Sequence, residues 1–231
     1  MMAQYYRLPF GDVLALEVGT QFPHLNDALK EPNGLLAIGG DLSCKRLLSA
    51  YKQGIFPWFS RDEPICWYSP DPRMVLFPEE LKVSDSLKKT LKNTPFEVRF
   101  NTAFREVMEA CASTKREGQG GTWITDEMIE AYCELHAKGY AISAETWHNN
   151  QLIGGCYGIK IGHMFYGESM FHKVKDASKI AFVRLVHKLH SESVGLIDCQ
   201  LKTSHLASLG AREISRLEFT QMLAKLIQKL I

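Results

Sequence analysis

Hydrophobic periodicity divides the second half of the chain into helices and strands. Apolar residues recur at helical spacing in four segments, 101–112, 125–138, 177–193 and 204–209. Strand-like apolar runs occupy 141–147, 152–160, 163–171 and 196–201. A last helix opens at Ser215, where Glu218 completes a capping box. The order helix, helix, three-strand meander, helix, strand, helix predicts a mixed α/β (α+β) layer domain.

The N-terminal stretch shows no comparable regularity. Ser43 suits the N-cap of one helix, which Gly54 ends. Five of the nine prolines fall within residues 57–78, a pattern typical of an extended junction between domains. We therefore predict a small irregular N-terminal domain over residues 1–70 and a larger mixed-sheet domain over 71–231.

Composition narrows the class of protein. The 231 residues are 45% hydrophobic and 23% charged, which is ordinary for a globular chain, and the net charge of +1 excludes a histone-like binder. Six cysteines without a Cys-x-x-Cys pair indicate reduced thiols in a cytosolic protein. Residues 1–7 lack the apolar segment of a signal peptide, and no run of 18 apolar residues predicts a membrane span.

Two acids lie in strands that should be buried. Glu168 interrupts one apolar run, and Asp198 ends another, two residues before Gln200. A buried acid is costly unless it is paired or hydrogen-bonded. Residues i and i+2 of a strand share a face, so Asp198 should point with Gln200, and Tyr166 and Met170 with Glu168. We expect one polar site from Glu168, Asp198 and Gln200; the alternative is two satisfied buried acids beside an edge residue.

Aromatic and basic residues give weaker signals. Trp58 follows a proline in a loop, where ligand contact and core anchoring are equal alternatives. Trp123 and Tyr132 begin and line one helix, and core packing is the simpler interpretation. Residues 82–116 hold eight basic and four acidic residues, which indicates a phosphate-binding strip or simply a solvated helix face. The glycine-containing stretch 115–120 faintly resembles a pyrophosphate-binding loop. It lies before the meander, however, and not between the last meander strand and the helix that follows, so it gives poor support to acyl-CoA binding.

Eight ordered segments together resemble the leucyl/phenylalanyl-tRNA–protein transferase family. They are EPNGLLAIGGDLS at 31–43, GIFPWF at 54–59, WYSPDPR at 67–73, GTWI at 121–124, GESMF at 167–171, ASK at 177–179, DCQ at 198–200 and ASLGA at 207–211. The resemblance covers nearly the whole chain. It implies an acetyltransferase-like (GNAT-type) larger domain in a cytoplasmic enzyme. It also implies transfer of Leu, Phe or, less well, Met from aminoacyl-tRNA to proteins that begin with Arg or Lys.

The resemblance also implies a set of site residues. The expected binding site for the 3′ adenosine and the amino-acid side chain comprises Trp58, Trp123, Tyr132, Phe165, Glu168, Leu185, Ile197, Asp198 and Gln200. Cys156 stands where the family often has a larger apolar residue, which predicts a wider side-chain pocket. Lys89 and Lys92 match positions that contact the tRNA backbone, whereas Asp85 replaces a basic residue.

A mechanism follows from these assignments. Converting an ester into an amide runs downhill without ATP, and an α-amine with a pKa near 7.7–8.0 is already partly neutral. We expect Gln200 to orient the amine, Asp198 to fix Gln200, and Glu168 to hold the amine or the acceptor's cationic side chain. No metal or cofactor is expected. Leu-tRNA, Phe-tRNA and acceptor proteins are the expected partners of a monomer, and modified proteins should enter N-degron degradation.

Two other functions remain open at this point. An acyl-CoA-dependent N-acetyltransferase would share the fold, and a non-catalytic adaptor would bind basic N-termini without tRNA.

Overall fold

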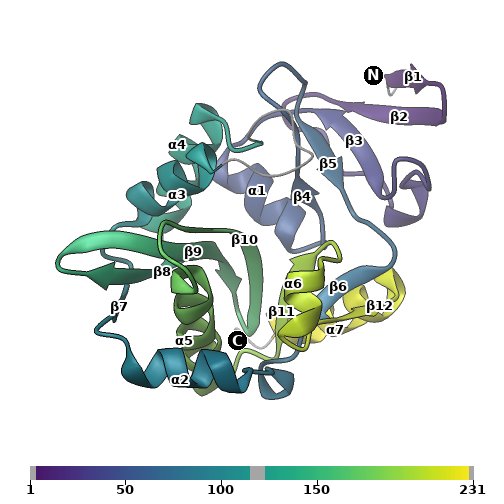
Figure 1. The fold of residues 1–231 in the computed structure, drawn as a ribbon. Helices are drawn as coiled ribbons and strands as arrows, with labels where there is room; N and C mark the ends of the chain where they lie inside the picture. The colour runs from purple at the N-terminus through teal and green to yellow at the C-terminus, as the bar shows by residue number, and fades with distance from the viewer. Residues whose placement is uncertain (1–3, 115–122, 229–231) are drawn as a thin grey trace.

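Two β-sheets organise the chain (Figure 1). The computed structural model describes residues 4–114 and 123–228. A five-stranded sheet has the order β1-β2-β3-β5-β4, and a seven-stranded sheet has the order β12-β6-β11-β10-β9-β8-β7. Parallel and antiparallel pairs occur in both sheets, so the predicted mixed α/β class is confirmed.

The N-terminal part is more regular than its sequence indicates. Its strands are β1 (Tyr5–Leu8), β2 (Gly11–Leu16), β3 (Leu35–Gly39), β4 (Phe56–Pro57) and β5 (Cys66–Tyr68). The prediction of an irregular N-terminal part is wrong, since these strands form a five-stranded sheet. Strands this short leave little periodicity to detect in the sequence. Helix α1 (Cys44–Tyr51) begins as predicted, with Ser43 Oγ accepting the Arg46 N–H at 3.3 Å. A short 3-10 turn, η1 (Leu25–Asp27), precedes β3.

The larger sheet contains the predicted meander. Its strands are β6 (Arg73–Leu76), β7 (Glu97–Phe100), β8 (Ala141–His148), β9 (Gln151–Ile161), β10 (Met164–His172), β11 (Leu196–Gln200) and β12 (Arg212–Ile214). Strands β8, β9 and β10 pair antiparallel, and β11 then joins β10 in parallel. Strands β6, β7 and β12 have only three or four residues each, too few to show an alternation in the sequence.

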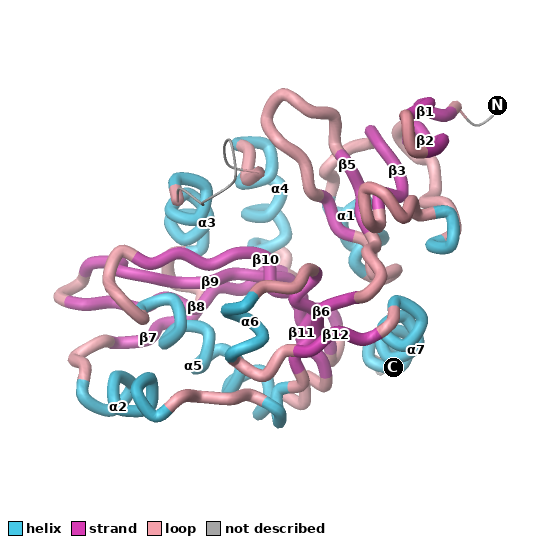
Figure 2. The backbone as a smooth tube through the Cα atoms, turned by 45° about the vertical axis from the view of Figure 1, so that its right-hand side comes forward, coloured by secondary structure: helices cyan, strands magenta, loops and turns pink. Residues whose placement is uncertain are grey.

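Helices cover both faces of this sheet (Figure 2). They are α2 (Asp85–Asn93), α3 (Phe104–Ser113), α4 (Asp126–Ala137), α5 (Ala177–Ser191), α6 (Ser204–Ser208) and α7 (Arg216–Gln228), with a 3-10 turn η2 (Pro78–Glu80). Helices α3 and α4 lie on one face and α5 on the other. Ser215 Oγ accepts the Glu218 N–H at 3.1 Å, which is the serine half of the predicted capping box.

One apolar core connects the two sheets. Its largest cluster includes Tyr51 of α1, Trp67 of β5, Tyr132 of α4 and Tyr166 of β10, all fully buried. Trp67 Nε1 also donates to the Gly39 carbonyl at 2.8 Å. This shared core places α1 directly against the meander. The division at residues 70 and 71 stays a prediction.

Candidate active site

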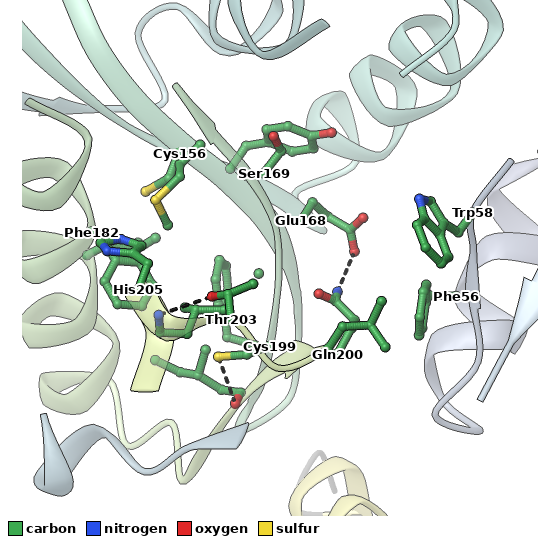
Figure 3. Close-up of a pocket in the computed structure, with 18 of the residues that line it drawn as sticks. Phe56, Trp58, Cys156, Glu168, Ser169, Phe182, Cys199, Gln200, Thr203 and His205 are labelled. Atoms are coloured by element: carbon green, nitrogen blue, oxygen red, sulfur yellow. Dashed lines mark hydrogen bonds between the residues drawn. The ribbon is translucent and has the colours of Figure 1, made fainter. Parts of the chain in front are cut away.

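A cavity of about 410 Å³ lies where β10, β11, α5 and α6 meet the loop after β4 (Figure 3). Eight of the predicted site residues line it: Trp58, Trp123, Cys156, Phe165, Glu168, Leu185, Ile197 and Gln200. Two others, Tyr132 and Asp198, do not line it; they are fully buried and support residues that do.

A β-bulge in β10 places Glu168 at the cavity. The pairing of β10 with β9 shifts between Gly167 and Ser169, so Glu168 is an extra residue in its strand. This shift puts Tyr166 in the core beneath the sheet, whereas Met170 lines the cavity. The expectation that Tyr166, Glu168 and Met170 share a face is therefore wrong, because the bulge interrupts the alternation.

A second bulge positions Gln200. The pairing of β11 with β6 shifts between Asp198 and Gln200, and Gln200 adopts the left-handed conformation with φ 55°. A non-glycine residue in this region costs on the order of 1–3 kcal/mol, so its surroundings must hold it there. Gln200 consequently lines the cavity together with Cys199, while Asp198 lies behind it. The expectation that Asp198 and Gln200 point together, opposite Cys199, is wrong.

Asp198 supports Gln200 through the backbone. Both carboxylate oxygens accept hydrogen bonds from Arg73, at 2.8 Å from Nε and 2.6 Å from Nη2. Asp198 Oδ1 also accepts the backbone N–H of Gln200 at 2.9 Å. Asp198 therefore contacts Gln200, as expected, and the contact is made to the backbone N–H.

The amide of Gln200 belongs instead to a network around Glu168. Gln200 Nε2 donates to Glu168 Oε1 at 3.4 Å, a long bond, and the two side chains point toward each other (Figure 3). Tyr51 donates to the same oxygen at 2.7 Å and hydrogen-bonds the hydroxyl of Tyr132. Sequence reasoning missed Tyr51, because its partners lie far away in the chain.

The surroundings of Glu168 strongly favour its neutral form. The pKa of Glu168 is raised to about 8, mainly by burial. The charge of Asp198 adds to this rise, while hydrogen bonds from Tyr51 and Tyr132 and the charge of Arg73 oppose it. Burial also raises the pKa of both tyrosines well above 10, so they remain donors. The pKa of Glu168 thus lies beside that of an α-amine, near 7.7–8.0. A proton can then pass between the two groups at little free-energy cost.

Two tryptophans lie at the wall of the cavity. Trp58 is 37% exposed and packs edge-on against Tyr68, with ring centroids 5.5 Å apart. Trp123 is partly buried and lies just before α4. That helix begins at its N-cap Thr125, whose side chain accepts the Met128 N–H. Trp123 packs against the main core cluster, whereas Trp58 is exposed; both residues line the cavity, where a ligand can contact them.

The remaining wall is apolar. Phe165, Leu185 and Ile197 are almost fully buried around Cys156. Helix α5 adds Phe182, which lies three residues before Leu185 and so shares its helix face, a spacing that could have revealed it. His205 of α6 also lines this end; burial, with Lys179 and His172, lowers its pKa. Burial raises the pKa of the Cys156 thiol far above its ordinary value, so the pocket stays uncharged there.

Some basic residues of the 82–116 strip are already paired with acids, and others are not. Lys88 pairs with Asp85 at 2.9 Å, while Arg99 and Arg105 pair with acids on β7 and α4. Lys89 and Lys92 are exposed on α2, and within residues 4–114 and 123–228 neither forms an ion pair. Lys115 and Arg116, the 115–120 stretch and the first two residues of the GTWI segment lie outside the described residues.

Comparison with known proteins identifies the family of this chain. The family model described as "Leucyl/phenylalanyl-tRNA protein transferase" matches residues 75–224, and the model of its N-terminal domain matches residues 40–71. A leucyl/phenylalanyl-tRNA–protein transferase of Nitrosomonas eutropha is 60% identical over 90% of this chain and 88% of its own. One from Chromobacterium violaceum is 62% identical over 84% of this chain and 83% of its own.

Similar solved structures are more distant. A GCN5-related N-acetyltransferase-like protein from Streptococcus suis has 13% identity and a TM-score of 0.37, covering 74% of this chain and 64% of its own. A GCN5-related N-acetyltransferase from Kribbella flavida has 10% identity and a TM-score of 0.37, covering 73% and 60%.

The family models together span most of the chain, and relatives at about 60% identity cover nine-tenths of it. The chain therefore belongs to the leucyl/phenylalanyl-tRNA–protein transferase family and is an aminoacyl-transferring enzyme.

Proposed function

We propose that the enzyme transfers Leu, Phe and, less well, Met from aminoacyl-tRNA to the α-amino group of proteins that begin with Arg or Lys. The observation that carries this proposal is one cavity with two unlike ends. Glu168 and Gln200 form a polar pair at one end, and Phe165, Leu185 and Ile197 form an apolar wall at the other. Such a cavity fits an apolar side chain whose ester carbonyl lies beside an incoming amine.

The reaction is aminolysis of an ester. The amine nitrogen bonds to the carbonyl carbon, the bond from that carbon to the tRNA 3′ oxygen breaks, and the amine's proton ends on that oxygen. In our proposal the Gln200 side-chain oxygen accepts a hydrogen bond from the amine, while its Nε2 faces Glu168. Glu168, with a pKa of about 8, exchanges a proton with the amine. Alignment of amine and ester supplies up to roughly 7–11 kcal/mol, so we propose neither metal nor cofactor.

The charges at the same site support the acceptor that we propose. An ammonium group and a basic first side chain beside Glu168 favour its charged form, and so oppose the burial that keeps Glu168 neutral in the free enzyme. Trp58 and Trp123 stack on the terminal adenosine, at about 1–3 kcal/mol per base. We propose that the enzyme acts as a cytoplasmic monomer and that its products enter N-degron degradation. Within the described part of the chain, no helix is long and apolar enough to cross a membrane.

The direct test mixes purified protein, Leu-tRNA and a peptide that begins with Arg, and measures peptide mass. We expect one added leucyl residue. Parallel reactions with acetyl-CoA, and with peptide but no tRNA, test the other two functions. Acetylated peptide identifies an N-acetyltransferase, and a peptide that binds but stays unmodified even with Leu-tRNA present identifies an adaptor; either result contradicts the proposal.

Neutralising the free lysines of α2 should weaken tRNA binding. The double variant Lys89→Ala/Lys92→Ala is expected to raise KM for Leu-tRNA and to reduce the slope of log KM against log salt by roughly 1–2, because two phosphate contacts are lost. Lys88→Ala is the matched control, since Lys88 is already paired with Asp85. A slope that both variants leave unchanged would show that the strip is only a solvated face.

Enlarging residue 156 should change the choice of amino acid. Cys156→Leu fills part of the apolar wall, so we expect the ratio of kcat/KM for Phe-tRNA to that for Leu-tRNA to fall by roughly 10-fold. Cys133→Ala on α4 is the control, because Cys133 does not line the cavity. An unchanged ratio in Cys156→Leu places the side-chain pocket elsewhere.

A further inference from the structure

The buried arginine behind Gln200 is held more firmly than an ordinary ion pair requires. Arg73 and Asp198 are 1% and 0% exposed, and their two-point contact fixes the guanidinium in the plane of the carboxylate. The guanidinium also lies between two rings, 4.8 Å from the centroid of Phe56 and 4.7 Å from that of Phe219. These rings come from β4 and α7, so β6, β11, the small sheet and the C-terminal helix all meet at Arg73.

This clamp acts on the backbone of Gln200. The same Asp198 oxygen that receives Arg73 Nε also accepts the Gln200 N–H, within the β-bulge that turns Gln200 into the cavity. A glutamine whose backbone lies in the left-handed region is unfavourable, and this conformation persists only where surrounding contacts hold it. Without that turn, regular alternation would carry the Gln200 side chain to the Asp198 side of β11, away from Glu168.

We propose that Arg73 is a positioning residue for aminoacyl transfer: by clamping Asp198 it holds the left-handed Gln200 that presents its amide to Glu168 and the acceptor amine. This inference rests on the proposed function of Gln200. Arg73 itself does not line the cavity. We therefore expect its substitution to lower kcat and to leave tRNA binding nearly unchanged.

The test compares Arg73→Lys with a matched buried arginine. Lysine keeps the charge but loses the planar two-point contact and the stacking between rings. We expect Arg73→Lys to lower kcat by roughly 10- to 100-fold, because small misplacements of a reacting group are costly. KM for Leu-tRNA should stay within about twofold. A crystal structure of the variant should show Gln200 outside the left-handed region.

Arg46→Lys provides the control. Arg46 is also buried, donates to the Glu17 and Thr20 carbonyls and lies 5.4 Å from the Phe22 ring, but none of these residues lines the cavity. Arg46→Lys should lower the free energy of unfolding and leave kcat unchanged. The neutral pair Arg73→Gln/Asp198→Asn leaves no isolated buried charge, which makes it the second variant if Arg73→Lys does not fold.

Each outcome decides between the alternatives. A folded Arg73 variant with kcat within about twofold of wild type overturns the positioning role. Unfolding of both Arg73 variants also overturns it, since Arg73 would then serve stability. An inactive wild-type enzyme with Leu-tRNA and the Arg peptide rejects the proposed function itself, whereas an active wild type with unaffected Arg73 variants rejects only this inference.

Discussion

Replacing Gln200 with asparagine is expected to lower kcat by about 100-fold while KM for Leu-tRNA stays within about twofold. Asparagine keeps the amide and tolerates a positive φ better than other non-glycine residues, so the turn at φ 55° should survive. Its side chain is one methylene shorter and does not span the 3.4 Å contact with Glu168. Single-turnover transfer of labelled leucine, measured beside tRNA binding, separates chemistry from affinity.

Two further substitutions complete this experiment. Gln200→Ala removes the amide and should reduce transfer at least as much, with some added loss of stability because alanine disfavours positive φ. Gln200→Glu keeps the length but loses the donor that faces Glu168, and it should also be slow. Wild-type turnover in folded Gln200→Asn and Gln200→Ala would remove Gln200 from the mechanism.

Replacing Glu168 with glutamine should stabilise the protein at alkaline pH while abolishing most of its activity. The pKa of Glu168 is raised from 4.5 to about 8 in the folded protein, so the folded state binds this proton more tightly than the unfolded state. The resulting stabilisation is fully present below pH 4.5 and is lost as pH rises through about 8. At 1.36 kcal/mol per pKa unit, the loss is on the order of 5 kcal/mol.

Glutamine cannot ionise, so Glu168→Gln should lack this loss. Denaturant unfolding between pH 5.5 and pH 9 should give wild-type stability that falls relative to the variant, while kcat/KM for the Arg peptide drops roughly 100-fold, at the lower end of what positioned acid–base groups contribute. Glu134→Gln is a suitable control, because Glu134 is an exposed partner of Lys138 with a lowered pKa and does not titrate in this range. Parallel stability curves for wild type and Glu168→Gln would contradict the burial argument.

Periodicity and turn residues located the main elements of the larger sheet. The meander β8–β10, helix α5 and strand β11 all appear where the apolar pattern predicts them, because their signals are local and each element is long enough to show its period. Short strands such as β4 and β12 escaped, since two or three residues cannot display an alternation. The same limit explains why the N-terminal sheet was described as irregular.

The identities of the cavity residues were also available from sequence. Glu168 and Gln200 stood out as polar groups in apolar strands, and the family resemblance added Trp58, Trp123 and the apolar wall. Their roles were not available in the same way. Tyr51 reaches Glu168 across 117 positions, and Arg73 reaches Asp198 across 125. No local pattern carries information over such separations.

By itself, then, the sequence determined the family, the element order and most of the residues around the cavity, because these depend on residue type and short-range spacing. Only the tertiary structure decided which way Asp198, Gln200 and Glu168 face. The two β-bulges that turn them arise from pairing between neighbouring strands, and the contacts that hold them come from distant elements packed in one shared core.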